Sequence, residues 1–222
     1  LIDKTRFAIS TEETRYYLNG IYLHAAKNDA GKTVLRSVAT DGHRLALAEL
    51  KAPKGSEKLA GVIVPRKTVS EIRRLIEART DEVAVEVSDT KIVVRAGRAV
   101  LTSKLIDGSF PDYERVLPRG GDKLVVADRQ GLREAFSRTA ILSNEKYRGI
   151  RLQLESGLLK IQANNPEQEE AEEEIAVDYN GSALEIGFNV SYLLDVLSVM
   201  TTEQVRLILS DANSSALVQE AD

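Results

Sequence analysis

Apolar residues recur along the chain at two different spacings, one helical and one extended. In residues 128–142, leucine, alanine and phenylalanine side chains return every three or four positions, which is the spacing of a single helix face. Residues 149–154 and 158–162 instead alternate apolar and polar positions on either side of Ser156-Gly157, a pair typical of turns. The pattern predicts a helix followed by an antiparallel hairpin whose second face meets water.

The same succession of patterns occurs twice in the chain. Residues 8–89 can be laid over residues 140–211 with small gaps, and five segments match in the same order. The last of them pairs VAVEVSD at 83–89 with VRLILSD at 205–211. Such agreement indicates an internal duplication. Each copy is expected to contain a helix, a hairpin, a second helix and a second hairpin.

The two copies differ at their ends. Beyond Asp89 the first copy continues into two predicted strands, 91–95 and 99–105, whereas the second has only residues 213–222 after the matching point. The second domain is therefore expected to lack its last strand and the tail that would follow it.

Helices that alternate with hairpins predict an α+β fold of two tandem duplicated domains, each with two helices packed on antiparallel sheet. A length of 222 residues with 43% hydrophobic residues is enough for two ordinary cores. Proline and glycine are concentrated in residues 118–121, which we interpret as a linker. The predicted domains span 1–117 and 122–222.

Charge restricts the classes of function. The net charge of -4 argues against a protein that coats nucleic acid with its whole surface. Six glutamates lie in residues 167–174, whereas residues 66–79 are basic. A site that binds a polyanion would therefore have to occupy one local face of the protein. The basic residues of 66–79 are Arg66, Lys67, Arg73, Arg74 and Arg79.

Composition also argues against metal sites and membrane spans. The chain has no cysteine, and His24 and His43 are its only imidazoles, so neither a disulfide nor a zinc site is expected. No cofactor is expected either. No segment approaches the roughly 20 apolar residues of a membrane span, and we expect a cytoplasmic protein.

Three short motifs have simple structural explanations. Asp41-Gly42 separates two alternating segments and favours a tight hairpin turn. Residues 28–33 (NDAGKT) end like a phosphate-binding loop, but Ala26 replaces its first glycine, so a polar hairpin tip is the better interpretation. The acidic run 167–174 could supply carboxylates to a two-metal nuclease, yet neighbouring residues project divergently, which favours a solvated edge.

Aromatic residues stand beside cations at equivalent places in the two copies. Arg15 precedes Tyr16-Tyr17, and Lys146-Tyr147-Arg148 occupies the matching position. Such rings can pack against nucleic acid while the cations meet phosphates. Core packing at a strand entry explains the pattern equally well.

Five longer motifs run through the chain: RYYLNG at 15–20, VATDGHRL at 38–45, FPDYERVLP at 110–118, ILSNEK at 141–146 and NNPEQEEA at 164–171. Together they resemble one family, the bacterial sliding clamp beta subunit of DNA polymerase III. The resemblance runs nearly end to end. It implies a head-to-tail homodimer with three similar domains per subunit, whose helices line a hole around duplex DNA. The present chain would hold the second and third domains.

The resemblance also implies a peptide-binding pocket between the second and third domains, used by the polymerase III alpha subunit, the clamp loader and other proteins with a clamp-binding motif. Tyr147 and Asn213 depart from the familiar pattern, which has phenylalanine and an aliphatic residue there. The implied pocket residues are Leu18, Thr40, Gly42, His43, Arg44, Leu45, Pro111, Arg115, Val116, Tyr147, Asn189, Tyr192 and Ser215.

DNA contacts are expected to be non-specific and directed at phosphates. Tyr16 and Tyr17 match DNA-contact positions of the family, whereas the helix cations rest on their face and charge. Ile141 and Leu142 match residues of the ring interface. The expected DNA-facing residues are Arg15, Tyr16, Tyr17, Arg66, Lys67, Arg73, Arg74, Lys146 and Arg148.

Two other classes of function remain open at this point. One is a protein-interaction module without a DNA role. The other is an enzyme, either an acid-cluster nuclease dependent on Glu169 and Glu170 or a nucleotide hydrolase dependent on Lys32. No catalytic triad or complete phosphate loop supports an enzyme, so the favoured hypothesis is a non-catalytic DNA polymerase processivity factor.

Overall fold

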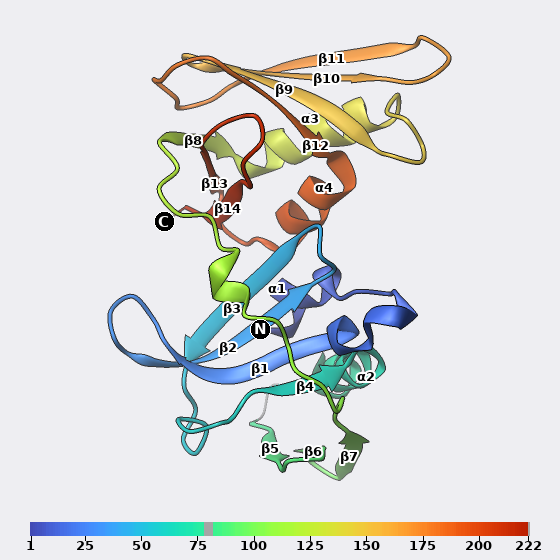
Figure 1. The fold of residues 1–222 in the computed structure, drawn as a ribbon, viewed down its shortest axis with the longest axis vertical. Helices are drawn as coiled ribbons and strands as arrows, with labels where there is room; N and C mark the ends of the chain where they lie inside the picture. Colours follow the sequence, from blue (N-terminus) through green and yellow to red (C-terminus); the bar gives the residue numbers. More distant parts are fainter. Residues whose placement is uncertain (78–81, 222) are drawn as a thin grey trace. The chain divides into compact units, whose positions relative to one another are not determined.

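The computed structural model describes residues 1–77 and 82–221, and the chain divides into two compact units, unit 1 (Leu1–Asp112) and unit 2 (Tyr113–Asp222) (Figure 1). The division falls shortly before the predicted linker at 118–121. Arg79, one of the basic residues noted above, lies outside the described residues. Within the described ranges, no helix is both long and apolar enough to cross a membrane.

Unit 1 contains two antiparallel sheets and one long helix. Its larger sheet has the strand order β3-β2-β1-β4, and its smaller sheet has the order β5-β6-β7. The helical elements are α1 (Ile2–Thr5), η1 (Arg6–Ala8), η2 (Glu13–Leu18) and α2 (Arg66–Glu77). The strands are β1 (Gly20–Lys27), β2 (Thr33–Thr40), β3 (Leu45–Lys51), β4 (Val62–Pro65), β5 (Ala84–Val87), β6 (Lys91–Ala96) and β7 (Ala99–Lys104).

Unit 2 repeats this plan with two long helices. Its larger sheet has the order β11-β10-β9-β12, and its smaller sheet has the order β14-β13-β8. The helical elements are η3 (Tyr113–Arg115), α3 (Arg129–Ala140) and α4 (Val190–Val199). The strands are β8 (Lys123–Asp128), β9 (Gly149–Glu155), β10 (Leu158–Asn164), β11 (Glu170–Ala176), β12 (Leu184–Asn189), β13 (Gln204–Leu209) and β14 (Leu217–Glu220).

The larger sheets confirm the duplication. β1 to β4 and β9 to β12 have the same order along the chain and in space, and each set leads into a helix, α2 or α4. The sequence predicted a single hairpin before the second helix of each copy. The structure adds an outer strand and a strand that leads into the helix, so each larger sheet has four strands. β11 was missed as a strand because its glutamates hide the inward positions of Ala171 and Ile175.

The two copies differ at their first helix and at their smaller sheet. The predicted first helix of unit 1 is only the four residues of α1 followed by the turn η1, whereas α3 has twelve residues. In unit 2, β13 pairs with both β14 and β8. None of the described residues of unit 2 forms a counterpart of β7, the third strand of the unit 1 sheet.

The helices stay in place because apolar stripes pack on the sheets. The predicted stripe of α3 is confirmed: Leu132 and Phe136 are buried in the core of unit 2, and Asp128 caps the helix by accepting a hydrogen bond from the Gly131 amide at 2.6 Å. In unit 1, Val69 and Ile72 of α2 are buried in the core. The polar face of α2 is therefore left outward.

Candidate peptide-docking and DNA-facing surfaces

A tightly bonded turn joins β2 to β3 and carries five of the predicted pocket residues, 40 and 42–45. One oxygen of the Asp41 carboxylate accepts hydrogen bonds from the His43 amide at 2.9 Å and the Arg44 amide at 3.0 Å. The Thr40 hydroxyl donates to the Arg44 carbonyl at 2.7 Å and accepts from the Gly42 amide at 3.1 Å. Gly42 has a φ of 89°, which favours glycine. The predicted tight Asp-Gly turn is confirmed.

Arg44 connects this turn to the start of the chain. Its Nε lies 3.2 Å from the second Asp41 oxygen, and its Nη2 donates to the Phe7 carbonyl at 2.8 Å. Its guanidinium carbon is 5.3 Å from the centre of the Phe7 ring. The Arg44 side chain is only 19% exposed, so it braces the turn as well as bordering its surface. Phe7 is a supporting residue that the sequence pattern did not identify, since it lies far from the turn in sequence.

The segment before β1 places the Arg15 side chain against the same turn and carries Tyr16 and Tyr17 directly after it in the sequence. The Arg15 guanidinium binds both oxygens of the Glu12 carboxylate, at 2.9 and 2.7 Å, and this hydrogen bonding lowers the pKa of Glu12. A Cβ added at Gly42 would lie 2.4 Å from an Arg15 nitrogen, so Arg15 lies against the turn. Tyr16 is 54% exposed and meets Tyr17 edge to face. Leu18, by contrast, is buried.

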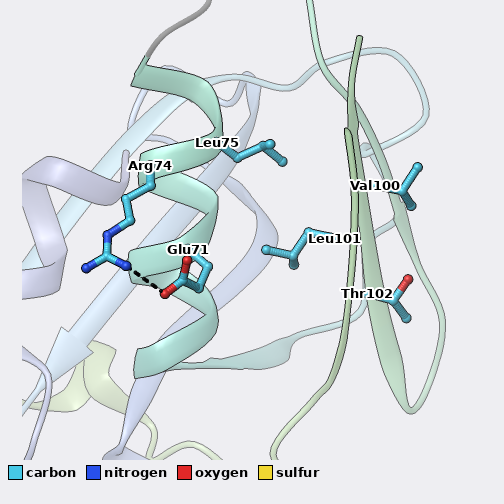
Figure 2. Close-up of a pocket in the computed structure, with 6 residues that line it drawn as sticks. All are labelled: Glu71, Arg74, Leu75, Val100, Leu101 and Thr102. Atoms are coloured by element: carbon cyan, nitrogen blue, oxygen red, sulfur yellow. Dashed lines mark hydrogen bonds and ion pairs between the residues drawn. The ribbon is translucent and has the colours of Figure 1, made fainter. Parts of the chain in front are cut away.

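The cations of α2 fall into two groups. Arg73 binds both Asp3 oxygens, at 2.7 and 2.8 Å, and Arg74 lies 3.1 Å from Glu71. Figure 2 shows Arg74 turned toward Glu71, beside an open depression between α2 and β7. Arg66 and Lys67 are exposed at the start of the helix, and within residues 1–77 and 82–221 neither forms an ion pair. The depression is lined by Glu71, Arg74, Leu75, Val100, Leu101 and Thr102.

In unit 2, the loop after α3 presents Tyr147. The Asn144 side chain accepts hydrogen bonds from the amides of Lys146 and Tyr147, at 3.0 and 2.9 Å, and Arg148 adopts a φ of 51°. Tyr147 is 67% exposed, and the Lys146 ammonium lies 5.2 Å from the centre of its ring. The backbone therefore holds an aromatic side chain at the surface.

Arg148 has a structural task of its own. Its Nη1 donates to the Ala140 carbonyl at the end of α3, at 3.0 Å, and its Nε donates to the Ser191 hydroxyl at 3.3 Å. A cation is favourable at a helix C-terminus, where carbonyls lack partners. Arg148 thus ties the end of α3 to the start of α4, in addition to its predicted place on the DNA-facing surface.

The remaining pocket residues lie at the start of α4 and in two exposed segments. Asn189 caps α4 by accepting from the Ser191 amide at 2.9 Å, and Tyr192 is half-buried one turn later. Ser215 is exposed beyond a turn in which Asp211 accepts from the Ser214 hydroxyl at 2.7 Å, which lowers the pKa of Asp211. Pro111, Arg115 and Val116 are exposed around the boundary of the units, with Val116 at 64%.

Two local groups hold part of the predicted pocket set, while Leu18, Pro111, Arg115, Val116 and Ser215 lie outside both. In unit 1 the hydrogen bonds of the 40–45 turn hold its members together. In unit 2 the contact between Arg148 and Ser191 links the Tyr147 loop to the start of α4. Ile141, one of the two predicted interface residues, is 76% exposed directly after α3, whereas Leu142 is half-buried.

The carboxylates of the acidic run 167–174 do not converge on one point. Because β11 alternates its side chains, Glu172 lies 2.7 Å from Lys160 while Glu173 turns to the other face and binds Arg138 at 2.6 Å. These hydrogen bonds lower the pKa of both glutamates. Among the described residues, no group of three or more histidine, aspartate or glutamate side chains is arranged to hold a metal ion.

Comparison with known proteins identifies the family. The model of the DNA polymerase III beta subunit central domain matches residues 1–112, and the model of its C-terminal domain matches residues 114–222. The chain belongs to the DNA polymerase III beta subunit family. Its fold is that of the clamp domains, as the resemblance implied. The central domain corresponds to unit 1 and the C-terminal domain to unit 2.

Individual relatives of the family agree with this assignment. The chain is 66% identical over its full length to a protein named beta sliding clamp from Pseudomonas putida, and 51% identical to the one from Caulobacter vibrioides. It covers 59% and 58% of those two proteins. A crystal structure of the DNA polymerase III subunit beta from Pseudomonas aeruginosa superimposes with a TM-score of 0.94 at 65% identity, over all of this chain and 60% of that one.

Proposed function

We propose that the full-length protein is a DNA polymerase processivity factor, a ring-shaped sliding clamp that encircles duplex DNA. The observation that carries this proposal is the identity of 66%, over the whole chain, to a beta sliding clamp. The chain spans about three fifths of that relative, at 59%, so the ring belongs to the longer protein. The proposed role is tethering and requires no catalytic residue.

Ring closure is proposed to occur in a homodimer with three domains per subunit. Ile141 is 76% exposed, which supports a contact at the end of α3. Burial of an exposed apolar side chain in an interface lowers the free energy in proportion to the area that it removes from water. Leu142 would pack at the edge of the same contact.

DNA would be held loosely inside the ring. Arg66 and Lys67 are the cations of α2 most available to phosphates, since Arg73 and Arg74 already lie beside carboxylates. Contacts of this kind carry no sequence information and weaken as salt rises. Weak contact suits a sliding ring, because topology retains the ring on DNA. Tyr16, Tyr17 and Lys146 would add contacts from the loops.

The docking pocket is proposed to use side chains of the 40–45 turn, the Pro111 segment and the Tyr147 loop. An apolar slot bordered by a few fixed polar groups can orient a short peptide. The partners would be the polymerase III alpha subunit, the clamp loader and other proteins with a clamp-binding motif. Two relatives support a ligand site on the fold: the sliding clamp of Pseudomonas aeruginosa has been crystallised bound to griselimycin, and that of Caulobacter crescentus with polyethylene glycol at its proposed beta-motif tethering region.

Retention on DNA tests the ring. The full-length protein, loaded by a clamp loader, should remain on nicked circular DNA through a high-salt wash and should leave linear DNA by sliding off its ends. Equal loss from both substrates would contradict encirclement. A protein-interaction module without a DNA role would give that result.

Peptide titration tests the pocket separately. A short clamp-binding peptide taken from a polymerase should bind the present chain, and the double substitution Arg44→Ala, Pro111→Ala should weaken binding. Asp29→Ala, in the exposed β1–β2 hairpin tip, is the control for an unrelated surface change. Unchanged affinity in the double variant would remove the pocket assignment and leave the ring proposal untouched.

A further inference from the structure

The chain contains two Asn-Gly sequences, Asn19-Gly20 and Asn180-Gly181, and the fold treats them differently. An asparagine followed by glycine is chemically labile, because no side chain hinders attack of the glycine backbone nitrogen on the asparagine side-chain amide. Attack requires the backbone around the asparagine to rotate. The surrounding hydrogen bonds and packing therefore decide whether each sequence can react.

Asn180-Gly181 lies in the exposed connection between β11 and β12, outside any strand. The Asn180 side chain accepts one long hydrogen bond, from the Ser156 hydroxyl at 3.5 Å. Within the described part of the chain, no acceptor binds the Gly181 amide. A Cβ added at Gly181 would collide with the Tyr179 hydroxyl, so the fold requires glycine there, and a glycine adds no side chain of its own beside the backbone nitrogen.

The backbone of Asn19-Gly20 is held by hydrogen bonds and by close packing. The Asn19 amide donates to the Tyr16 carbonyl at 3.0 Å, and the Asn19 carbonyl accepts from the Arg66 amide at 2.9 Å. The Asn19 side-chain oxygen is buried and has no hydrogen-bond partner among the described residues, so packing alone holds the side chain. Gly20 is buried in β1, and a Cβ there would lie 2.2 Å from the Val64 carbonyl oxygen. Rotation at Asn19 would break these contacts, since the interior is close-packed.

We propose that Asn180 is a site of spontaneous deamidation in the folded protein and that Asn19 is protected from it. The Gly181 backbone nitrogen loses its proton to solvent base and bonds to the side-chain carbonyl carbon of Asn180. The bond from that carbon to the amide nitrogen breaks, and the nitrogen leaves as ammonia. Water then opens the cyclic imide at either carbonyl, which gives an aspartyl or an isoaspartyl linkage with no oxidation or reduction.

The modification would alter a connection that joins both sheets of unit 2. Asp178 exchanges backbone hydrogen bonds with Val126 of β8, at 2.8 and 3.0 Å, and the Gly157 amide donates to the Tyr179 carbonyl at 2.9 Å. The buried Tyr179 donates its hydroxyl proton to the Ser182 carbonyl at 2.7 Å. An isoaspartyl linkage lengthens the main chain by one carbon between Tyr179 and Ser182, which would displace that acceptor. Either product also adds a negative charge.

The test is peptide mapping of the folded chain after incubation at mildly alkaline pH, by mass spectrometry that separates aspartyl from isoaspartyl products. Deamidation at Asn180 should be roughly tenfold or more faster than at Asn19, the internal control, since each 1.36 kcal/mol of barrier is tenfold in rate. In denaturant the two rates should converge, because the sequences are then equally free.

Two results would overturn the proposal. One is a rate at Asn180 in the folded chain no greater than that at Asn19. The other is a ratio of the two rates that denaturant leaves unchanged, since the fold would then not be its cause. Asn180→Gln, an exposed change in the same connection, should abolish the product at this position, which confirms that the measured ammonia and charge change come from Asn180.

Discussion

At the scale of single residues, Asp41 has two structural roles in the 40–45 turn, whereas its sequence motif indicated only the turn itself. One of its oxygens organises the backbone of the 40–45 turn, and the other holds Arg44. The two tasks can be separated by substitution, because asparagine keeps an oxygen for the backbone amides and loses the charge.

Asp41→Ala should destabilise unit 1 by about 1–2 kcal/mol, since two backbone amides lose their acceptor. Asp41→Asn should cost less than Asp41→Ala, because the oxygen that accepts from the backbone amides is kept and only the charge beside Arg44 is lost. The free energy of unfolding from urea titration measures both, with Asp29→Ala as the matched control. Equal costs for the two Asp41 variants would contradict the separate roles.

At the scale of elements, α3 combines a buried apolar stripe with an ion pair at the surface. Phe136 has no exposed surface and lies at the centre of the unit 2 core. Arg138, two residues later, reaches over the sheet to Glu173 of β11 at 2.6 Å. The first contact is insensitive to pH and the second is not, so they can be measured apart.

Phe136→Ala should destabilise unit 2 by about 3–5 kcal/mol, because it removes a large buried side chain and leaves a cavity. Val100→Ala, at a 54% exposed position of unit 1, should change stability by less than about 0.5 kcal/mol. Urea titration followed by a unit-specific probe gives both values. A small loss for Phe136→Ala would mean that the core around α3 can collapse into the space.

The Arg138–Glu173 pair should make α3 stability depend on pH. Hydrogen bonding from Arg138 depresses the pKa of Glu173 in the folded state, so the contribution is present above the ordinary glutamate value and is lost as pH falls through the lowered one. Glu173→Gln should therefore flatten the acid limb of a stability-against-pH curve. Glu167→Gln, in the same acidic run but outside β11, serves as control, and identical acid limbs for Glu173→Gln and the unsubstituted chain would exclude the pair as a cause.

At the scale of the whole molecule, DNA contact should depend on Arg66 and Lys67, which form no ion pair with the residues that the structure describes. In the full-length ring, both Arg66 and Lys67 are replaced by Glu. If each meets one phosphate, the fall of log affinity with log salt should become less steep, by roughly two units of slope. Replacing Arg73 by Gln should change the slope less, because Asp3 already binds that guanidinium. Titration of a DNA duplex at several salt concentrations measures the slopes. Equal effects of the two changes would contradict this distinction.

Much of the architecture could be predicted from local patterns. The stripe of α3, the hairpin around Ser156-Gly157 and the Asp41-Gly42 turn follow from residue spacing and turn chemistry, which act over a few neighbours. The duplication followed from comparison of the chain with itself, and the order of its two larger sheets confirms it. The family resemblance rested on long motifs, and the matches to both domain models confirm it.

Other features were decided only by tertiary structure. β11 is a strand because β10 offers it a full row of backbone partners, although its glutamates give no strand pattern. Phe7 supports Arg44, and Arg148 joins two helices, through contacts between residues far apart in sequence. The same holds for the two Asn-Gly pairs. Their sequences are identical, and only packing and hydrogen bonding distinguish the exposed pair from the protected one.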